Sequence, residues 1–114
     1  TDHTPLDTEE KNVEFDNAAY GTIGLESAFG ILNQLFDLEK TIQLLTKGRE
    51  TYGLKTPKLN KGEKACLTLF NPDGISIFQS ENSISTSKNC AFFGKEHKGT
   101  VYGIISNNNF KIIN

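Results

Sequence analysis

The spacing of apolar residues changes once along this 114-residue chain, and that change limits the folds it can adopt. Over residues 24–36 the apolar side chains recur three and four positions apart, which predicts an amphipathic helix. After Pro57 apolar and polar residues alternate, as they do in half-buried strands. Helices followed by strands, without interleaving, are typical of the α+β class, with a boundary near residues 54–60. The predicted helical face comprises Leu25, Ala28, Phe29, Leu32, Leu35 and Phe36.

Two further short helices are predicted before the boundary. Asp37 can cap a helix over residues 38–48, and a third helix over residues 48–53 is expected to end at Gly53. Gly30 lies within the first helix. A residue without a side chain at that position predicts a close packing contact with another element.

The second half of the chain is predicted to form strands joined by turns. The segment "ACLTLF" at residues 65–70 alternates, and "ISIF" at residues 75–78 forms a second predicted strand. Between them, "NPDG" at residues 71–74 predicts a tight turn. Residues 100–106 and 110–114 are predicted to pair as a hairpin, because the asparagines between them tolerate positive φ.

Composition excludes several classes of protein. Net charge is −2, Arg49 is the single arginine, and no lysine and arginine cluster marks a nucleic-acid-binding face. No apolar run approaches the roughly 20 residues that cross a membrane. Cys66 and Cys90 have no metal-site spacing, so two buried free thiols in a reducing compartment are expected, with a disulfide as the alternative.

The order of the predicted elements is unusual for a whole domain. Residues 1–22 are polar and turn-rich, and loops of that length are usually functional or disordered. The helices and the final strands have few obvious reasons to share one core. We therefore expect two incomplete pieces of a larger structure, although a free-standing adaptor domain is a further alternative.

Four stretches, in order, resemble the dihydroorotases of the amidohydrolase superfamily. They are "TDHTP" followed by "EEK", then "FDNAAYGTIGLESAFG", "LNKGEKACLTLFNP" and "STSKNCAFFGKEHKGTVYGII". The resemblance covers essentially the whole chain and implies the C-terminal part of a (β/α)₈ metal-dependent hydrolase. Residues 1–55 would be the end of the barrel, with its active-site loop and last helices. Residues 56–114 would be the C-terminal part of a small β-sandwich.

The resemblance implies a catalytic role for Asp2. In the family, an Asp at this place binds a divalent metal and carries a proton, and zinc is the metal expected for the intact protein. Hydrolysis of a cyclic amide needs a carboxylate that takes a proton and returns it to the leaving nitrogen. The alternative is an Asp in a polar loop. Because Asp2 would be a single ligand, we expect the fragment alone to bind no metal and to be inactive.

The resemblance also implies a substrate-binding loop, and it identifies one departure. Ala19, Tyr20 and Gly21 match a loop whose backbone N–H groups contact substrate, although a turn before a helix is an equal interpretation. Leu6 stands where the family has a His that holds the substrate carboxylate. Losing that donor costs on the order of 1.5–3 kcal/mol, or one to two powers of ten in binding.

Structural roles are expected for the other polar residues in the matching stretches. His3 neighbours Asp2 but points to the other face of a strand, and Glu26 is expected in the first turn of its helix. Lys88 and Asn89 are interpreted as turn residues, and His97, in the polar "GKEHKG", as solvent-exposed.

Two functions therefore remain open from the sequence. The first is a cytoplasmic dihydroorotase-type hydrolase of pyrimidine biosynthesis that interconverts N-carbamoyl-aspartate and dihydroorotate. The second, favoured by Leu6, is a non-catalytic dihydroorotase-like paralogue that binds or stabilises a partner such as aspartate carbamoyltransferase. Both exclude nucleic acid and membrane as partners, and both expect a homo-oligomer.

Overall fold

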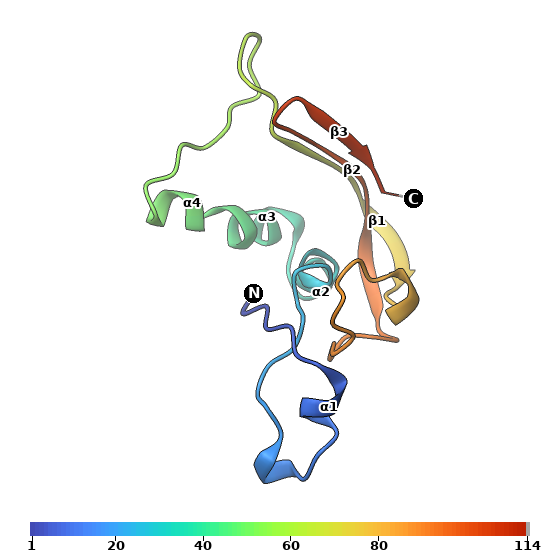
Figure 1. Ribbon diagram of the computed structural model, residues 1–114. Helices are drawn as coiled ribbons and strands as arrows, with labels where there is room; N and C mark the ends of the chain where they lie inside the picture. Colours follow the sequence, from blue (N-terminus) through green and yellow to red (C-terminus); the bar gives the residue numbers. More distant parts are fainter. Residues whose placement is uncertain (114) are drawn as a thin grey trace.

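The computed structural model describes residues 1–113 and has the predicted α+β organisation (Figure 1). A three-stranded antiparallel sheet, in the order β1-β2-β3, lies beside a chain of short helices. The elements are α1 (Thr8–Lys11), a 3₁₀ turn (Phe15–Asn17), α2 (Ala28–Leu35), α3 (Leu38–Thr46), α4 (Gly48–Thr51), β1 (Leu67–Ile77), a second 3₁₀ turn (Ser80–Asn82), β2 (Glu96–Ser106) and β3 (Asn109–Ile112).

Local chemistry sets the ends of the helices. The side chain of Asp37 accepts a hydrogen bond from the backbone N–H of Lys40 at 2.8 Å, which confirms the predicted cap of α3. Gly53 follows α4 with φ +63°, a conformation that glycine adopts without strain. The first helix begins later than predicted, at Ala28, because the residues before it form a turn that is held by contacts with a distant loop.

The C-terminal hairpin follows the sequence prediction. Strands β2 and β3 pair in antiparallel register, and Asn107 and Asn108 between them have φ of 50° and 62°. Two consecutive positive φ values give the turn whose twist matches a hairpin, and asparagine tolerates them better than most residues. Asn114, the last residue of the predicted strand, lies outside the described residues.

The predicted turn at residues 71–74 is wrong. The two short strands expected on either side of it are one long strand, β1, which pairs with β2 both before and after an irregularity between Asn71 and Ile75. The turn residues make this bulge, and the Asn71 side chain accepts a hydrogen bond from the N–H of Asp73 at 3.0 Å. A partner strand of equal length keeps the chain from reversing.

Asn33 of α2 fastens the helix to this bulge. Its side-chain amide is buried and donates to the carbonyls of Pro72 at 2.8 Å and Lys98 at 3.0 Å. Both carbonyls lie where the ladder between β1 and β2 is irregular. A buried amide therefore satisfies backbone acceptors that the sheet leaves free.

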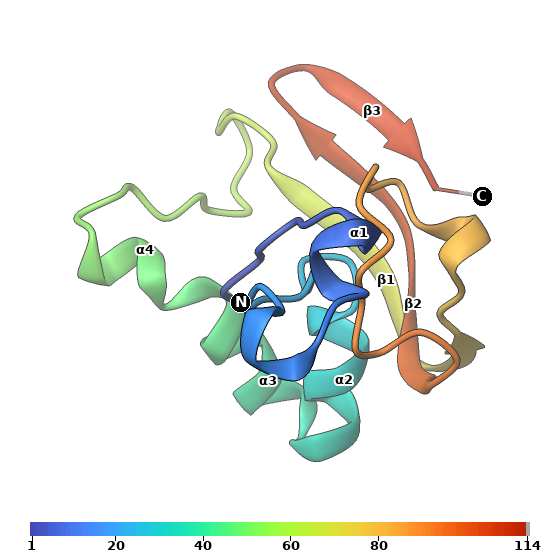
Figure 2. The ribbon, with the colours of Figure 1, turned by 60° about the horizontal axis from the view of Figure 1, so that its bottom comes forward.

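Close approach of α2 to the sheet depends on two glycines. A Cβ at Gly30 would lie 2.5 Å from the Cβ of His97, which confirms the predicted close contact. A Cβ at Gly99, on β2, would lie 2.5 Å from the ring of Phe29. Phe29 in turn meets Phe70 of β1 edge to face, with ring centroids 5.0 Å apart. Figure 2 shows α2 lying across the long strands.

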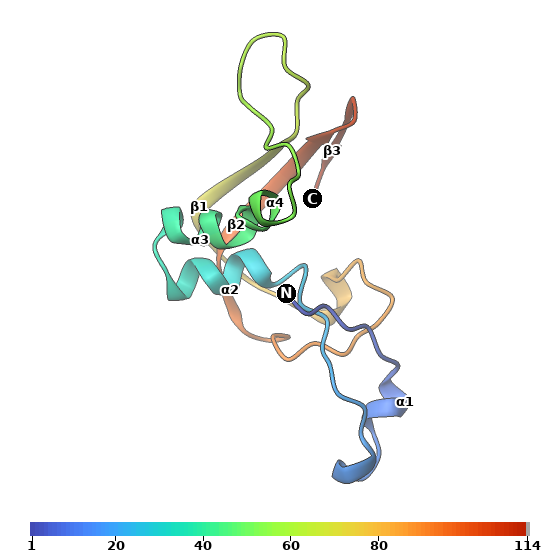
Figure 3. The ribbon, with the colours of Figure 1, turned by 90° about the vertical axis from the view of Figure 1, so that its left-hand side faces the viewer.

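The chain is extended for its size. Its Cα radius of gyration is 16.2 Å, whereas about 13 Å is expected for a compact chain of this length. Its accessible surface is 8722 Å², about 2,500 Å² more than the roughly 6,200 Å² expected for its mass. Among the apolar side chains of residues 1–113, Ile23 is the one that reaches full burial. Figure 3 shows the N-terminal segment and the segment before β1 projecting from opposite ends.

One face of the sheet is uncovered and apolar. Because side chains alternate along a strand, residues adjacent to the helix-facing Phe70 point away from α2. Leu67, Ile105 and Phe110 are aligned across the three strands on that outer face, and Leu69 and Ile112 form the next row. Phe110 and Ile112 are 58% and 59% exposed. We call these five residues the outer sheet face.

No helix within the described part of the chain is long and apolar enough to span a membrane. Both cysteines are free thiols, but Cys66 is exposed, so the expectation of two buried thiols is wrong for that residue.

Candidate functional site

The first residues of the chain pair with the segment that precedes α2. His3 forms an isolated parallel bridge with Thr22, and the N–H of Thr4 donates to the Thr22 carbonyl at 2.9 Å. Asp2, the candidate catalytic residue, lies just before this bridge. It is solvent-exposed and has φ of 44°, in the left-handed region. The pairing of His3 and Thr4 with Thr22 fixes the position of the backbone next to Asp2.

His3 has the structural role expected from the sequence. Its Nδ1 accepts hydrogen bonds from the backbone N–H groups of Gly24 at 3.1 Å and Leu25 at 3.2 Å. An acceptor nitrogen carries no proton, so this arrangement requires the tautomer protonated at Nε2. The ring therefore joins the first segment to the start of the α2 turn.

The loop over residues 19–21 is held from its N-terminal side by α1. The N–H of Ala19 donates to the Glu10 carbonyl at 3.1 Å, and the Lys11 ammonium donates to the Ala19 carbonyl. The side chain of Tyr20 is 90% exposed. Nothing from the protein covers this part of the loop within residues 1–113, and its surface is open to a ligand or to another part of a larger protein.

Gly21 closes the loop against the first segment. Its φ is 133°, and a Cβ there would lie 2.6 Å from the Cβ of Thr4. A larger residue would separate the loop from the segment that carries Asp2. The structure thus brings the sequence-predicted site residues Asp2, Ala19, Tyr20 and Gly21 onto two neighbouring segments.

Leu6 is bound through its backbone. Its N–H donates to the Ser87 hydroxyl oxygen at 3.2 Å, and that hydroxyl donates to the Leu6 carbonyl at 2.7 Å. Ser87 is buried. The position therefore keeps its place in the fold, while its side chain offers no polar group to a ligand.

A strap over residues 86–91, in which Lys88 and Asn89 were predicted to be turn residues, is hydrogen-bonded to the segment that precedes α2. The N–H of Ile23 donates to the Asn89 carbonyl at 2.8 Å, and the Asn89 amide donates to the Gly21 carbonyl at 2.9 Å. The N–H of Ala91 donates to the Thr22 hydroxyl at 3.0 Å. These bonds join segments nearly 70 positions apart, and no local pattern in the sequence predicts such pairing.

Glu26 is a structural anchor, but it precedes α2 and does not lie in its first turn. Its carboxylate accepts hydrogen bonds from the backbone N–H groups of Ile84 at 2.8 Å and Ser85 at 3.1 Å, and from the Ser83 hydroxyl at 3.0 Å. Loss of hydration alone would raise its pKa. The hydrogen bonds and the charge of Lys88 outweigh that effect and lower the pKa below its usual value.

His97 is buried, so the prediction of an exposed histidine is wrong. It is 5% exposed, its ring lies 5.4 Å from that of Phe78, and its Nε2 has no hydrogen-bond partner among the described residues. The polar neighbours in sequence misled the prediction, because alternate residues of a strand face opposite sides. Burial lowers the pKa of His97 below its usual value.

This burial predicts that the protein loses stability in mild acid. The unfolded chain takes up a proton at His97 near pH 6.5, and the folded chain does so only at lower pH, so stability falls as pH drops below about 6.5. The loss reaches at most about 1.4 kcal/mol per pH unit. His97 lines a cavity between α2 and the sheet, and Glu26, the other ionisable residue that lines it, already accepts three hydrogen bonds.

The change in thermal unfolding midpoint between pH 7.5 and pH 5 measures this effect. We expect His97→Leu to reduce the change and Glu9→Gln, a control at an exposed carboxylate, to leave it in place. An unaltered pH dependence in His97→Leu would contradict the assignment.

The residues at this site do not make a metal centre by themselves. Within residues 1–113 no three His, Cys, Asp or Glu side chains are grouped so that they could hold an ion. A stable centre takes at least three protein ligands, whereas Asp2 offers one carboxylate and the Nδ1 of His3 is already an acceptor.

Comparison with known proteins gives one consistent result. No family model matches the chain. Curated proteins named dihydroorotase do match it. Those of Caldicellulosiruptor saccharolyticus and Chlorobaculum tepidum are 40% and 39% identical over 114 residues, covering 94% of this chain and 26% of each relative. The dihydroorotase of Bacillus subtilis is 36% identical over 101 residues, covering 82% of the chain and 24% of that relative. The chain is thus a sequence relative of the dihydroorotases that spans about a quarter of their length.

Proposed function

We propose that the chain is the C-terminal part of a dihydroorotase-type hydrolase of the cytoplasm, acting in pyrimidine biosynthesis. In this proposal residues 1–55 complete a (β/α)₈ barrel and residues 56–114 contribute strands to a small β-sandwich. The dihydroorotase relatives support the family, and the large uncovered surface supports a chain that packs against more protein. The outer sheet face is the surface expected to meet the rest of the sandwich.

One observation carries the assignment of the site. The bridge between His3 and Thr22 puts the exposed carboxylate-bearing residue Asp2 beside the loop that ends at Gly21. A carboxylate and a glycine-containing loop, brought together from separate segments, can serve two different roles in one active site. The carboxylate handles protons, and backbone N–H groups orient a polar substrate.

The proposed reaction is hydrolysis of a cyclic amide, run in either direction. Water adds to the amide carbon of dihydroorotate, and the bond from that carbon to the ring nitrogen breaks to give N-carbamoyl-aspartate. Asp2 takes a proton from the attacking water and delivers it to the departing nitrogen, so the carboxylate is restored. Tyr20 and Gly21 would hold the substrate through their backbone N–H groups, whereas the N–H of Ala19, expected from the resemblance to do the same, donates to the Glu10 carbonyl.

A divalent metal, with zinc as the expected ion, belongs to the proposal only for the intact protein. Asp2 would be one ligand there, and the others must come from outside the part of the chain described by the structure.

Leu6 provides a test of substrate binding in the intact protein. Restoring the family's donor with Leu6→His should lower KM for dihydroorotate by about tenfold to a hundredfold, the worth of a hydrogen bond to a charged group. The backbone bonds to Ser87 do not depend on the side chain, so the fold should survive. Leu6→Phe, which adds a ring without a hydrogen-bond donor, is the matched control and should leave KM unchanged.

An unchanged KM in Leu6→His would show that the carboxylate is held elsewhere, and the proposed placement of Leu6 at the substrate would fail. Steady-state kinetics of both variants decide this.

Leu6 itself favours a second candidate, a non-catalytic paralogue that binds a partner such as aspartate carbamoyltransferase. Turnover and co-purification distinguish the paralogue from the hydrolase. A paralogue would show no turnover of dihydroorotate in the intact protein and none after Leu6→His, yet it would co-purify with its partner.

A further inference from the structure

A small cavity lies where three segments of the chain meet, and Asp2 is not among the residues that line it. Its volume is about 280 Å³. Its lining residues come from α4, from the segment before β1 and from the β2–β3 turn, whose courses Figure 1 shows. The polar side chains that line it include Arg49, Lys55, Glu63, Lys64, Ser106 and Asn107.

Cations outnumber carboxylates among the charged side chains that line the cavity. Arg49, Lys55 and Lys64 face one carboxylate, that of Glu63, which lies 3.7 Å from the Lys55 ammonium. That contact is the one ion pair found within residues 1–113, so two cations of the cavity have no carboxylate partner there. The wider surroundings add to the positive potential, because six of the twelve Lys and Arg residues lie within residues 47–64, beside two glutamates.

Arg49 is oriented by the backbone. Its Nε and Nη2 both donate to the Lys55 carbonyl, at 3.3 Å and 2.8 Å. These bonds hold the guanidinium in place, and Nη1 keeps donors without a protein acceptor in the described hydrogen bonds. One edge of the guanidinium is held by the protein, so its orientation is set before a ligand binds. Its free N–H groups can then donate to a carboxylate or a phosphate.

We propose that this cavity binds a small anion that carries a phosphate or carboxylate group. Arg49 donates hydrogen bonds to its oxygens, Lys64 contributes charge, and the hydroxyl of Ser106 and the amide of Asn107 are further donors at the rim. A macromolecular anion fits less well, because the volume is just below the 300–1,000 Å³ of typical ligand sites. The site is independent of the hydrolase proposed above.

Calorimetric titration of the purified protein with inorganic phosphate, glycerol phosphate and acetate tests the proposal. Arg49→Gln and Lys64→Gln should each weaken binding, Arg49→Gln by about tenfold or more. Arg49→Lys, which keeps the charge and loses the planar fork, should not restore affinity. Glu63→Gln should strengthen binding, because it removes the one carboxylate that faces the anion.

Lys58→Gln is the matched control. Lys58 lies in the same basic segment but does not line the cavity, so its replacement should leave affinity unchanged. Preference for the phosphates or for acetate identifies the ligand group, and either outcome supports the site. Circular dichroism confirms that each variant retains its fold.

Three outcomes would overturn the proposal. They are no binding of any probe at millimolar concentration, equal losses in Lys58→Gln and Arg49→Gln, and tighter binding of a short DNA duplex than of the small anions, which would indicate a diffuse basic surface. Because the readout is binding and not turnover, failure here leaves the proposed hydrolase untouched.

Discussion

Replacing Asp2 with alanine should reduce dihydroorotate turnover by the intact protein at least about a hundredfold. A positioned group that transfers protons typically contributes two to four powers of ten in rate, and no other carboxylate stands on the paired segments around His3 and Thr22 in the part of the chain described here. Asp2 is exposed, so its replacement should not disturb packing. The loss should fall on kcat, because the proton moves in the transition state.

Asp16→Ala is the control for this experiment. Asp16 is also exposed and also lies in the N-terminal segment, within the 3₁₀ turn, away from the bridge. Its replacement should leave the rate near that of the unchanged protein. If Asp2→Ala kept more than a few per cent of the activity, the catalytic assignment of Asp2 would be wrong.

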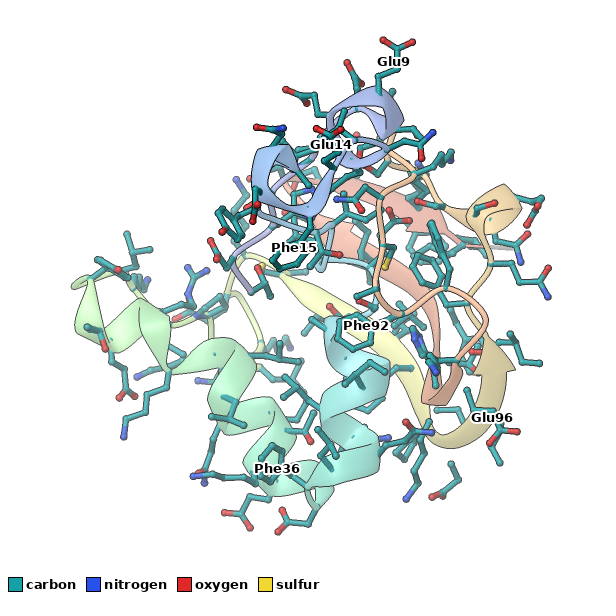
Figure 4. The ribbon with its side chains drawn as sticks, turned by 90° about the horizontal axis from the view of Figure 1, so that it is seen from below. Glu9, Glu14, Phe15, Phe36, Phe92 and Glu96 are labelled. Carbon is teal, nitrogen blue, oxygen red and sulfur yellow. The ribbon has the colours of Figure 1, made fainter. Side chains whose placement is uncertain are left out.

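The 114-residue chain, purified alone, should self-associate at micromolar concentration. Its surface exceeds that of a compact protein of equal mass by about 2,500 Å², more than one partner loses in a standard protein–protein interface. The outer sheet face presents Phe110 and Ile112, and both sheet edges are open. Phe15 and Phe36 are also exposed, at 87% and 44%, and Figure 4 shows Phe15 at the N-terminal segment and Phe36 at the end of α2. A symmetric dimer is the simplest closed arrangement.

Analytical ultracentrifugation measures this association. Phe110→Lys, on the outer sheet face, should shift the chain toward monomer by placing charge in the contact. Leu59→Lys is the control, because Leu59 is 83% exposed but lies outside the sheet. A monomer of ordinary frictional ratio with a cooperative thermal transition would contradict the view that these elements need more protein to cover them.

Sequence reasoning succeeded where neighbouring residues decide the structure. The cap at Asp37, the helix end at Gly53 and the hairpin turn at Asn107 and Asn108 each depend on the conformational preference of a residue and its immediate neighbours. The general α+β organisation followed from the single change in apolar spacing.

It failed where distant segments override local preference. The "NPDG" turn became a bulge because β2 runs alongside the whole of β1, and Asn33 of α2 satisfies the carbonyls there. Glu26 was expected inside a helix, but three donors from residues 83–85 hold it outside. His97 was predicted to be exposed because its neighbours in sequence are charged. It is buried because α2 packs closely against it at Gly30.

The candidate site was also predicted only in part. Asp2 and the loop ending at Gly21 were identified by resemblance to the dihydroorotases, and the sequence alone gave no reason to pair them. Their proximity depends on the bridge at Thr22 and on Asn89, which binds the Gly21 carbonyl from a strap far along the chain. Contacts of that sequence separation have no signature in a single sequence.

The most direct test of the proposed function is the turnover of dihydroorotate by the intact protein, measured beside the 114-residue chain alone with divalent metal present. The proposal predicts steady hydrolysis and ring closure by the intact protein and none above background by the isolated chain, which offers one candidate metal ligand and one part of the substrate site. An intact protein without turnover, or an isolated chain with it, would contradict the proposal.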